Sequence, residues 1–494
     1  MAETQGPPAG SAAEAAAGSS TGMTPGVPPP PAKREPRKLD RSLVEGPIGA
    51  AVWKIAWPTV LQNAIGGLQG IIDHAMVGHY VGYEGNAAIG VSWQIFLVVI
   101  VFISSLFTGM AVLVARFAGA NDHDKVNRTV YQAFLTAFAL AVCILAPVGY
   151  FAAPSLLELV NASPEVRTEA LPFLRTMFLF SIGMLMFFML SGALRAAGDA
   201  RTGLHLGAAM TVLNITLNVI LIRGAGPIPA FGTQGAAIGT VLASGIVSST
   251  ALWMILKGRL VIHFPEHMSW RPDWTIIRQL FKFGLPTGIQ GVAMNIAGVL
   301  LLRFIGSLEH SAEAQAAYAV GYAELFSLIT WTSVGLMGAA AAVAGQNLGA
   351  GRPDRSAKAV HLAARVGLGV AALVGAMFIL IPHHLLAVFG LREPVVVALG
   401  TELLRYLSVS GFFITVALTF TGGLQGTGDT RSPLFITLIS QVAVPLGICF
   451  GVQQFGTLQS STVWTAILCG HFTRCALSVI RFQQGHWRRI AVEV

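Results

Sequence analysis

Charged residues are scarce in this chain. They make up only 11% of its 494 residues, whereas hydrophobic residues make up 54%. Soluble domains carry about 25% charged residues, and the mean hydropathy of this chain is +0.67. The composition therefore excludes a water-soluble protein.

Several motifs of chemistry are also absent. The four cysteines lie in or beside apolar stretches, without the spacing of a metal site or a disulfide framework. There is no Walker-type GxxxxGK(S/T) segment and no nucleophile elbow. We therefore expect neither an enzyme nor an ATP-driven pump, with no cofactor and no bound metal.

Long apolar windows are what the sequence has in abundance. About 20 apolar residues suffice to cross a bilayer as a helix. The sequence predicts an all-α integral membrane protein with twelve transmembrane helices, near residues 52–79, 88–115, 130–151, 171–192, 204–222, 235–256, 283–305, 316–344, 361–382, 397–422, 434–451 and 462–481.

The basic residues are distributed unevenly between the two sides of the predicted membrane. With both termini in the cytoplasm, 25 of the 31 Lys and Arg fall on the cytoplasmic side. The opposite side keeps Arg167, Arg175, Arg223, Arg303, Arg392 and Arg405. This asymmetry orients membrane proteins. It predicts a multi-pass protein of the cell inner (plasma) membrane and removes any need for a nucleic-acid partner.

The two ends of the chain are predicted to be tails. Residues 1–44 contain "GMTPGVPPPPAKREPRK", which lacks the apolar core of a signal peptide and is typical of a disordered cytoplasmic tail. Residues 483–494 are expected to form a second cytoplasmic tail. We expect a monomer whose partner is the lipid bilayer.

The chain repeats itself at a separation of about 230 residues. "AWPTVLQ" around Pro58 matches "GLPTGIQ" around Pro286, and "LRAAGDART" (Leu194–Thr202) matches "LQGTGDTRS" (Leu424–Ser432). The repeat predicts two six-helix lobes in parallel orientation, residues 45–260 and 261–482, of the kind that transporters rock about a central site. The paired GDxR turns are interpreted as structural, with Asp199 and Asp429 capping helices or bridging to Arg201 and Arg431.

These features together resemble one transporter family. The segments "IIDHAMVG", "ARFAGAND", "GQNLGAG", "NITLN" and the doubled "LxxxGDxR" look like the multidrug and toxic compound extrusion (MATE) family over about residues 47–480. The resemblance implies secondary antiporters that expel amphipathic, often cationic, compounds in exchange for H⁺ or Na⁺. Other branches carry a Glu in the seventh helix and an Asp in the tenth, which this chain lacks, so it is most similar to the DNA-damage-inducible protein F type.

Asp73 is the leading candidate for ion coupling. It lies in the outer half of the first predicted helix, where it is either an interfacial carboxylate or a buried functional one. The matched position of the second half is Leu301, so the architecture does not require an acid there. A carboxylate that is shielded from water can be neutral when protonated and charged when not. Its ionisation is therefore expected to change with access to either side of the membrane.

The same comparison selects two asparagines. Asn214 and Asn218 lie one turn apart on a helical face, and their counterparts are Val444 and Ile448. They either tie helices together by hydrogen bonds or complete a polar cluster with Asp73. Resemblance to the family implies that Thr240 joins Asp73, Asn214 and Asn218 in an ion- or proton-binding cluster.

Other residues are candidates for a substrate cavity. Aromatic rings such as Trp93, Phe187 and Tyr322 can stack on drugs, although most such rings serve packing. Glu324 either lines the cavity or caps a helix start, and Asn295 stands in the seventh helix near the position where other branches carry an acid.

Two questions stay open at this point. A lipid-linked oligosaccharide flippase of the same broader superfamily is the alternative function, but its pyrophosphate headgroup would demand several basic residues in the cavity. A receptor or channel fits duplicated halves less well. The coupling ion is H⁺ or Na⁺. A proton needs one suitable acid, whereas Na⁺ needs about five or six oxygens.

The charge distribution makes a prediction about topology. In a background without the native cysteines, Glu309→Cys should react from outside the cell with a membrane-impermeant thiol reagent, and Asp354→Cys should not. The reverse labelling pattern would contradict the orientation.

Overall fold

The computed structural model describes residues 39–160, 162–265 and 268–492. Within these residues the chain is helical throughout, and the only β-type pairing is an isolated bridge between Ala225 and Ile228. The predicted amino-terminal tail lies outside the described residues as far as residue 38.

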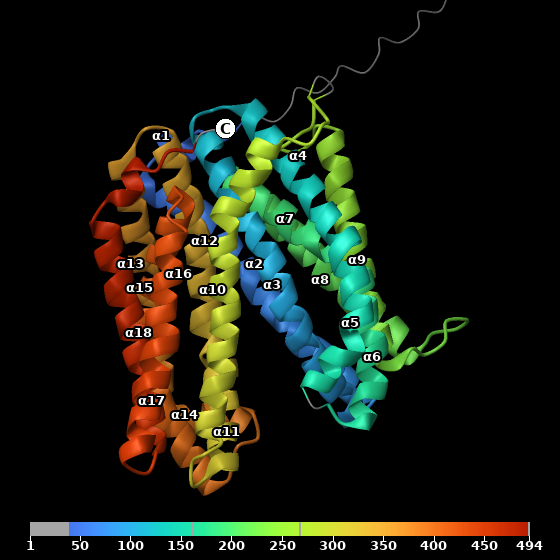
Figure 1. The fold of residues 1–494 in the computed structure, drawn as a ribbon, viewed down its shortest axis with the longest axis vertical. Coiled ribbons are helices and arrows are strands. Elements are labelled where there is room, and N and C mark those ends of the chain that lie inside the picture. Colours follow the sequence, from blue (N-terminus) through green and yellow to red (C-terminus); the bar gives the residue numbers. More distant parts are fainter. Residues whose placement is uncertain (1–38, 161, 266–267, 493–494) are drawn as a thin grey trace, which may run out of the picture. The chain divides into compact units, whose positions relative to one another are not determined.

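A short helix, α1 (Ser42–Glu45), precedes the amino-terminal half of the fold. That half then consists of α2 (Ile48–Tyr80), α3 (Tyr83–Gly119), α4 (His123–Ala139), the π-helical η1 (Leu140–Leu145), α5 (Ala146–Leu159), α6 (Pro164–Leu179), α7 (Ile182–Ala196), α8 (Ala200–Arg223) and α9 (Gly232–Leu256). These helices form the blue-to-green part of Figure 1.

The carboxyl-terminal half repeats this plan in the yellow-to-red part of Figure 1. Its elements are α10 (Trp274–Ile305), α11 (Ser311–Tyr318), the π-helical η2 (Ala319–Leu325), α12 (Ser327–Gly349), α13 (Pro353–Leu380), α14 (Pro382–Val388), α15 (Pro394–Thr427), α16 (Arg431–Thr437), the π-helical η3 (Leu438–Ala443), α17 (Val444–Phe455), α18 (Ser460–Gln483) and the 3₁₀ helix η4 (His486–Arg489). Helix α15 packs against both α13 and α18.

All twelve predicted windows correspond to helices, and several spans are assembled from more than one element. Ten helical stretches of the described residues are long and apolar enough to cross a membrane, and α6 with α7, bent by 53°, forms an eleventh. Helix α2 is long enough to cross a membrane but is less apolar than these helices, because it contains Gln62, Asn63, Gln69, Asp73 and His74. Its polar side chains have a specific use, described below.

Side chains at helix starts determine where the chain enters each helix. Asp122, Ser163, Asp199 and Asp273 each accept a hydrogen bond from a backbone N–H in the first turn of the helix that follows. Such caps satisfy amide groups that have no partner inside the helix. The capping interpretation of Asp199 is confirmed.

The two halves meet at the end of the molecule that carries the GDxR turns. A hydrophobic cluster combines Ile55 of α2 with Val343 of α12 and Ala363 of α13. Between the halves, Nε2 of Gln346 donates to the backbone oxygen of Ala196 over 2.7 Å. A Cβ on Gly119 would lie 1.9 Å from the backbone oxygen of Gln346, so only glycine permits this approach of α3 to α12.

Residues 39–44 and 483–492 are more ordered than the sequence suggests. Residues 39–44, expected within a solvated tail, include the fully buried Leu43, and Lys54 forms an ion pair with Asp40. Burial opposes ionisation of Asp40, but hydrogen bonds from Lys54 and Ser42 hold the pKa of its carboxyl below the ordinary value. The tail prediction was wrong for this segment because its few apolar side chains find a surface on α12.

The carboxyl-terminal segment is likewise packed rather than free. Trp487 of η4 is 1% exposed and stacks on Phe482, with 4.8 Å between the ring centroids. The backbone oxygen of Ile490 accepts a 2.8 Å hydrogen bond from Arg116 of α3. Residues 483–492 therefore join the end of the second half to the first half.

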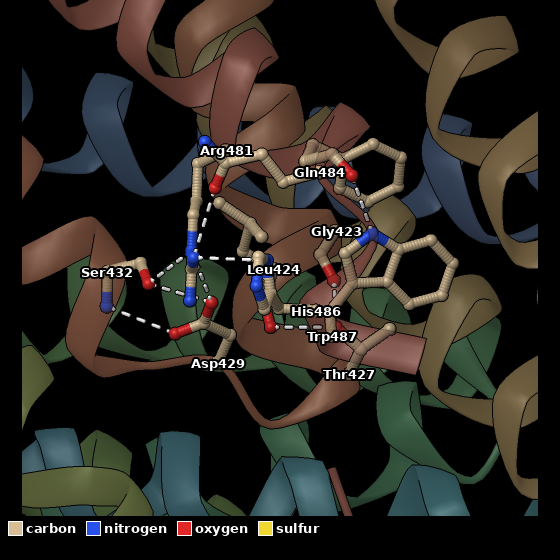
Figure 2. Close-up of polar contacts among 10 residues, drawn as sticks. Gly423, Leu424, Thr427, Asp429, Ser432, Arg481, Gln484, His486 and Trp487 are labelled. Atoms are coloured by element: carbon tan, nitrogen blue, oxygen red, sulfur yellow. Dashed lines mark hydrogen bonds and ion pairs between the residues drawn. The ribbon is translucent and has the colours of Figure 1, made fainter. Parts of the chain in front are cut away.

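Asp429 anchors this end of α18, as Figure 2 shows. Its carboxylate accepts hydrogen bonds from the backbone N–H and the hydroxyl of Ser432, over 3.1 and 2.7 Å. The same carboxylate pairs with Arg481 of α18 over 3.2 Å, rather than with Arg431 as expected from sequence. Because Asp429 is only 6% exposed, this ion pair is shielded from water.

We expect Asp429→Ala to lower the thermal unfolding midpoint of the purified protein, because it removes about 1–3 kcal/mol of capping and buried-pair stabilisation. Asp429→Asn should recover the capping share. The matched control is Asp354→Ala, since Asp354 pairs with Arg488 but is largely exposed. Equal losses at the two positions would contradict a special role for the shielded pair.

Candidate ion-coupling site and substrate cavity

Asp73 lies in the last third of α2, seven residues before that helix ends at Tyr80. Its side chain is half-buried and lines a cavity of about 650 Å³. Helix α2 packs against α8, which brings the "NITLN" segment to the same place. The carboxylate is therefore held between helices of the first half and does not lie at a loop.

The four residues selected from sequence form one hydrogen-bonded chain. Nδ2 of Asn218 donates to Oδ1 of Asp73 over 2.8 Å and lies 3.4 Å from Oδ1 of Asn214. Nδ2 of Asn214 donates to Oγ1 of Thr240 over 3.0 Å, and that hydroxyl donates to the backbone oxygen of Ala236. Asn214 and Asn218 are fully buried. A single chain of contacts thus connects α2, α8 and α9.

Asn218 is positioned by a glycine on the neighbouring helix. A Cβ added to Gly239 of α9 would lie 1.9 Å from Oδ1 of Asn218, which is closer than any real contact. This oxygen is buried and has no hydrogen-bond partner within the described residues. The absence of a side chain at Gly239 is what allows Asn218 to turn its amide nitrogen towards Asp73.

Further polar pairs extend the wall along α2. Oγ1 of Thr211 donates to Oε1 of Gln69 over 2.8 Å, and Nε2 of Gln62 donates to Oγ of Ser191 over 2.8 Å. All four residues line the cavity. The sequence reasoning missed these pairs, although the polarity of α2 was a signal that one of its faces avoids lipid.

Aromatic side chains form another part of the cavity wall. Trp93 and Phe187, two of the predicted substrate-contacting residues, line it together with Phe188 and Trp331. Trp331 comes from α12 of the second half, and its indole packs where a Cβ of Gly67 would lie, 2.4 Å away. The cavity of the first half is therefore partly closed by the second half.

Three predicted cavity residues lie elsewhere. Tyr322 stacks on Tyr318 inside the second half, with 5.0 Å between the ring centroids. Asn295 donates to the backbone oxygen of Gly291 in its own helix. Glu324 lies in η2, and its backbone oxygen accepts a hydrogen bond from Ser327. The structure does not bring these residues to the cavity that contains Asp73, and a role for them in substrate binding stays a prediction.

One basic residue of the wall was not predicted. Arg195, in the last turn of α7, lines both the main cavity and a neighbouring cavity of about 380 Å³. Its guanidinium packs against Gly338 of α12, within 3.2 Å of where a Cβ would be. Its repeat counterpart, Gln425, lines the smaller cavity. That mismatch of Arg with Gln was the signal available in the sequence.

The matched positions of the second half are used for packing. Leu301, the counterpart of Asp73, is 8% exposed and belongs to a hydrophobic cluster against which Ile448, the counterpart of Asn218, also packs. The described residues contain no group of three or more His, Cys, Asp or Glu side chains arranged to hold a metal ion. At these two matched positions the first half therefore has polar side chains and the second half has apolar ones.

Comparison with known proteins agrees with the internal repeat. The MatE family model matches residues 58–220 and matches the chain a second time at residues 286–450. The chain belongs to the MATE family. Both matched segments begin at the prolines that defined the repeat, Pro58 and Pro286.

Named relatives cover nearly the whole chain. The probable multidrug resistance protein NorM of Thermotoga maritima is 26% identical over 448 residues, which cover 89% of this chain and 93% of that protein. The multidrug resistance protein MdtK of Pectobacterium atrosepticum is 25% identical over 400 residues, covering 78% and 83%.

Solved structures show the same fold. A multidrug resistance MATE transporter of the MOP superfamily, in an outward-facing conformation, matches with a TM-score of 0.83 at 20% identity, covering 91% of this chain and 98% of that one. A MOP superfamily transporter from Pyrococcus furiosus matches with a TM-score of 0.82 at 21% identity, with the same coverages. The chain is a membrane transporter of two six-helix lobes and not an enzyme. Its placement beside the DNA-damage-inducible protein F type stays an expectation.

The contact of Gly239 with Asn218 makes a specific prediction. Gly239→Ala should displace the Asn218 amide from Asp73 and reduce drug export at unchanged membrane expression, because the added methyl group has no space. Gly245→Ala, in the same helix with nothing within 4 Å of its Cβ, is the control. Export that is equal in the two variants would show that the Asn218 contact is dispensable.

Proposed function

We propose that this MATE transporter is a secondary antiporter that exports amphipathic, often cationic, compounds in exchange for protons by alternating access. The observation that carries the proposal is the chain Asp73–Asn218–Asn214–Thr240 at the wall of the 650 Å³ cavity. Asp73 is the one acid among the described residues of this wall, which also carries the aromatic rings of Trp93 and Phe187.

Asp73 suits the coupling step because its state can change without rebuilding the site. The carboxylate accepts the amide N–H of Asn218 when charged, and a protonated carboxyl still offers an oxygen to the same donor. Proton binding removes the negative charge that attracts a cationic substrate. Proton and drug therefore compete for one residue, which is the minimum requirement for exchange.

The cavity wall supports an amphipathic cation as substrate. Trp93, Phe187 and Trp331 offer ring faces for apolar and cationic groups. Arg195 is the one Lys or Arg among the described lining residues. A pyrophosphate-linked lipid would need several cations, so the flippase alternative finds little support in this wall.

The arrangement of donors favours H⁺ over Na⁺. Asn218 directs an N–H group, not an oxygen, at Asp73, and Asn214 directs its N–H at Thr240. A Na⁺ ion would require these amides to rotate so that their oxygens face the carboxylate. A proton requires no such rearrangement. We further propose that the protein is a monomer of the inner membrane with both termini in the cytoplasm, as the basic residues indicate.

The test is drug accumulation in everted vesicles under an imposed pH gradient without Na⁺. The wild type should accumulate a fluorescent cation, and Asp73→Asn should reduce this at least about 100-fold while leaving expression and the unfolding midpoint close to wild type, because only the titrating group is lost.

Leu301→Asn, at the matched position of the second lobe, is the control and should keep its dependence on the pH gradient. Accumulation that needs Na⁺ and ignores the pH gradient would refute the proton. Equal loss of gradient dependence in both variants would refute the asymmetric site.

A further inference from the structure

Arg474 of α18 is a buried arginine without an acidic partner. It is 2% exposed, and within residues 39–160, 162–265 and 268–492 it has neither an ion pair nor a hydrogen bond. Taking an unpaired cation out of water costs several kcal/mol even after relaxation. Such a residue inside a membrane helix marks a function unless a partner neutralises it.

The position of Arg474 in α18 directs it into the second lobe. Trp464, His471, Arg474 and Ser478 recur at spacings of three, four and seven residues and are all at most 2% exposed. They form the stripe of α18 that faces inwards. Arg474 thus lies on the lobe interior and cannot extend along the helix surface to reach the lipid headgroups.

Polar atoms from a second helix approach the same stripe. Gly470, one turn before Arg474, packs so closely on η3 that a Cβ would lie 2.7 Å from the backbone oxygen of Ser440 and 3.5 Å from Nε2 of Gln441. Nε2 of Gln441, Oγ of Ser440, Oγ of Ser478 and Nε of Arg474 are all buried without a hydrogen-bond partner in the described residues. Each of these four groups can donate a hydrogen bond.

Aromatic rings of the second lobe stack on His471, which lies one turn before Arg474 on the same stripe of α18. Tyr322 and Phe326 stack on His471, with ring centroids 6.4 and 5.7 Å apart. The charge of Arg474 acts on both Tyr322 and His471. Arg474 and His471 are therefore buried on a side of α18 that aromatic rings of the second lobe cover.

The first lobe has no such group at the matched place. Repeat separations of 228–230 align Arg474 with residues 244–246, which are Ser, Gly and Ile. The π-helical segments η2 and η3, which carry Tyr322 and Gln441, align with regular stretches of α3 and α8. Such π-turns occur frequently at functional sites. At these matched positions the second lobe therefore has a cation and π-helical backbone, and the first lobe has neither.

We propose that the second lobe binds a small monovalent inorganic anion of the chloride class at Arg474, with Gln441, Ser440 and Ser478 as hydrogen-bond donors. An unpartnered guanidinium, with Ser478 one helical turn after it and the Gly470–Gln441 contact one turn before it, offers donors that an anion satisfies and a cation or apolar ligand does not. This site is separate from the proton site at Asp73 and does not depend on the proposed antiport.

The test is the thermal unfolding midpoint of the full-length protein in detergent, with sodium chloride replaced by sodium gluconate at constant ionic strength. Chloride should raise the wild-type midpoint by at least about 2 °C in a saturable manner, because it binds only the folded state. Bromide should do the same.

Arg474→Met should fold, since an apolar side chain of similar length replaces a buried charge, and should lose the chloride effect. Arg405→Gln, at an exposed arginine of the same lobe, should keep the effect, as should Asp73→Asn. Gln441→Leu should weaken chloride binding at least about 5-fold, because it removes one donor. Radioactive chloride should also bind saturably to the wild type. This measurement can refute the proposal even if Arg474→Met does not fold.

Equal wild-type midpoints in chloride and gluconate, or the absence of saturable chloride binding, would overturn the proposal. Retention of the chloride effect in Arg474→Met would also overturn it.

Discussion

The hydrogen bond from Asn218 to Asp73 is the contact on which the rest of the first lobe depends. A carboxylate at membrane depth must be solvated by the protein, because lipid offers no donors. Supplying that donor fixes the rotation of α8 against α2 and the closeness of α9 through Gly239. The same rotation turns Gln62, Gln69 and Thr211 into the cavity. This one hydrogen bond thus constrains how α2, α8 and α9 pack and which polar side chains line the cavity.

The two lobes share a scaffold and differ in chemistry. Matching turns, capping aspartates and prolines give both halves the same six-helix plan, and Asp199 and Asp429 cap equivalent helices in the same way. The polar interior was then distributed unequally. An acid lies in the first lobe where the second has Leu301, and a cation lies in the second where the first has only neutral residues. The shared scaffold thus carries different polar groups in its two halves.

Apolar length was enough to predict every span, and the internal repeat selected Asp73, Asn214 and Asn218, because one-turn spacing places the two asparagines on one face whatever the packing. The membership of Thr240 came from the family resemblance. Residues that act between helices could not be found in this way. Arg195 reaches the cavity only because α7 crosses it, and Tyr322 misses it because η2 turns the ring into its own lobe. Trp487 was read as part of a tail because its binding surface is built by distant helices.

The polar face of α2 also bears on how the protein is made. Asn218 lies 145 residues after Asp73, so at about 5–20 residues per second the ribosome supplies this donor roughly 7–30 s later. During that interval the first span has a weak hydrophobic signal and a carboxyl without its final partner. Membrane insertion of α2 must therefore rely on the strongly apolar α3 that follows it. The first lobe can finish packing only after α8 has been inserted into the membrane. Until then we expect α2 to be the helix that proteases of membrane-protein quality control recognise most readily.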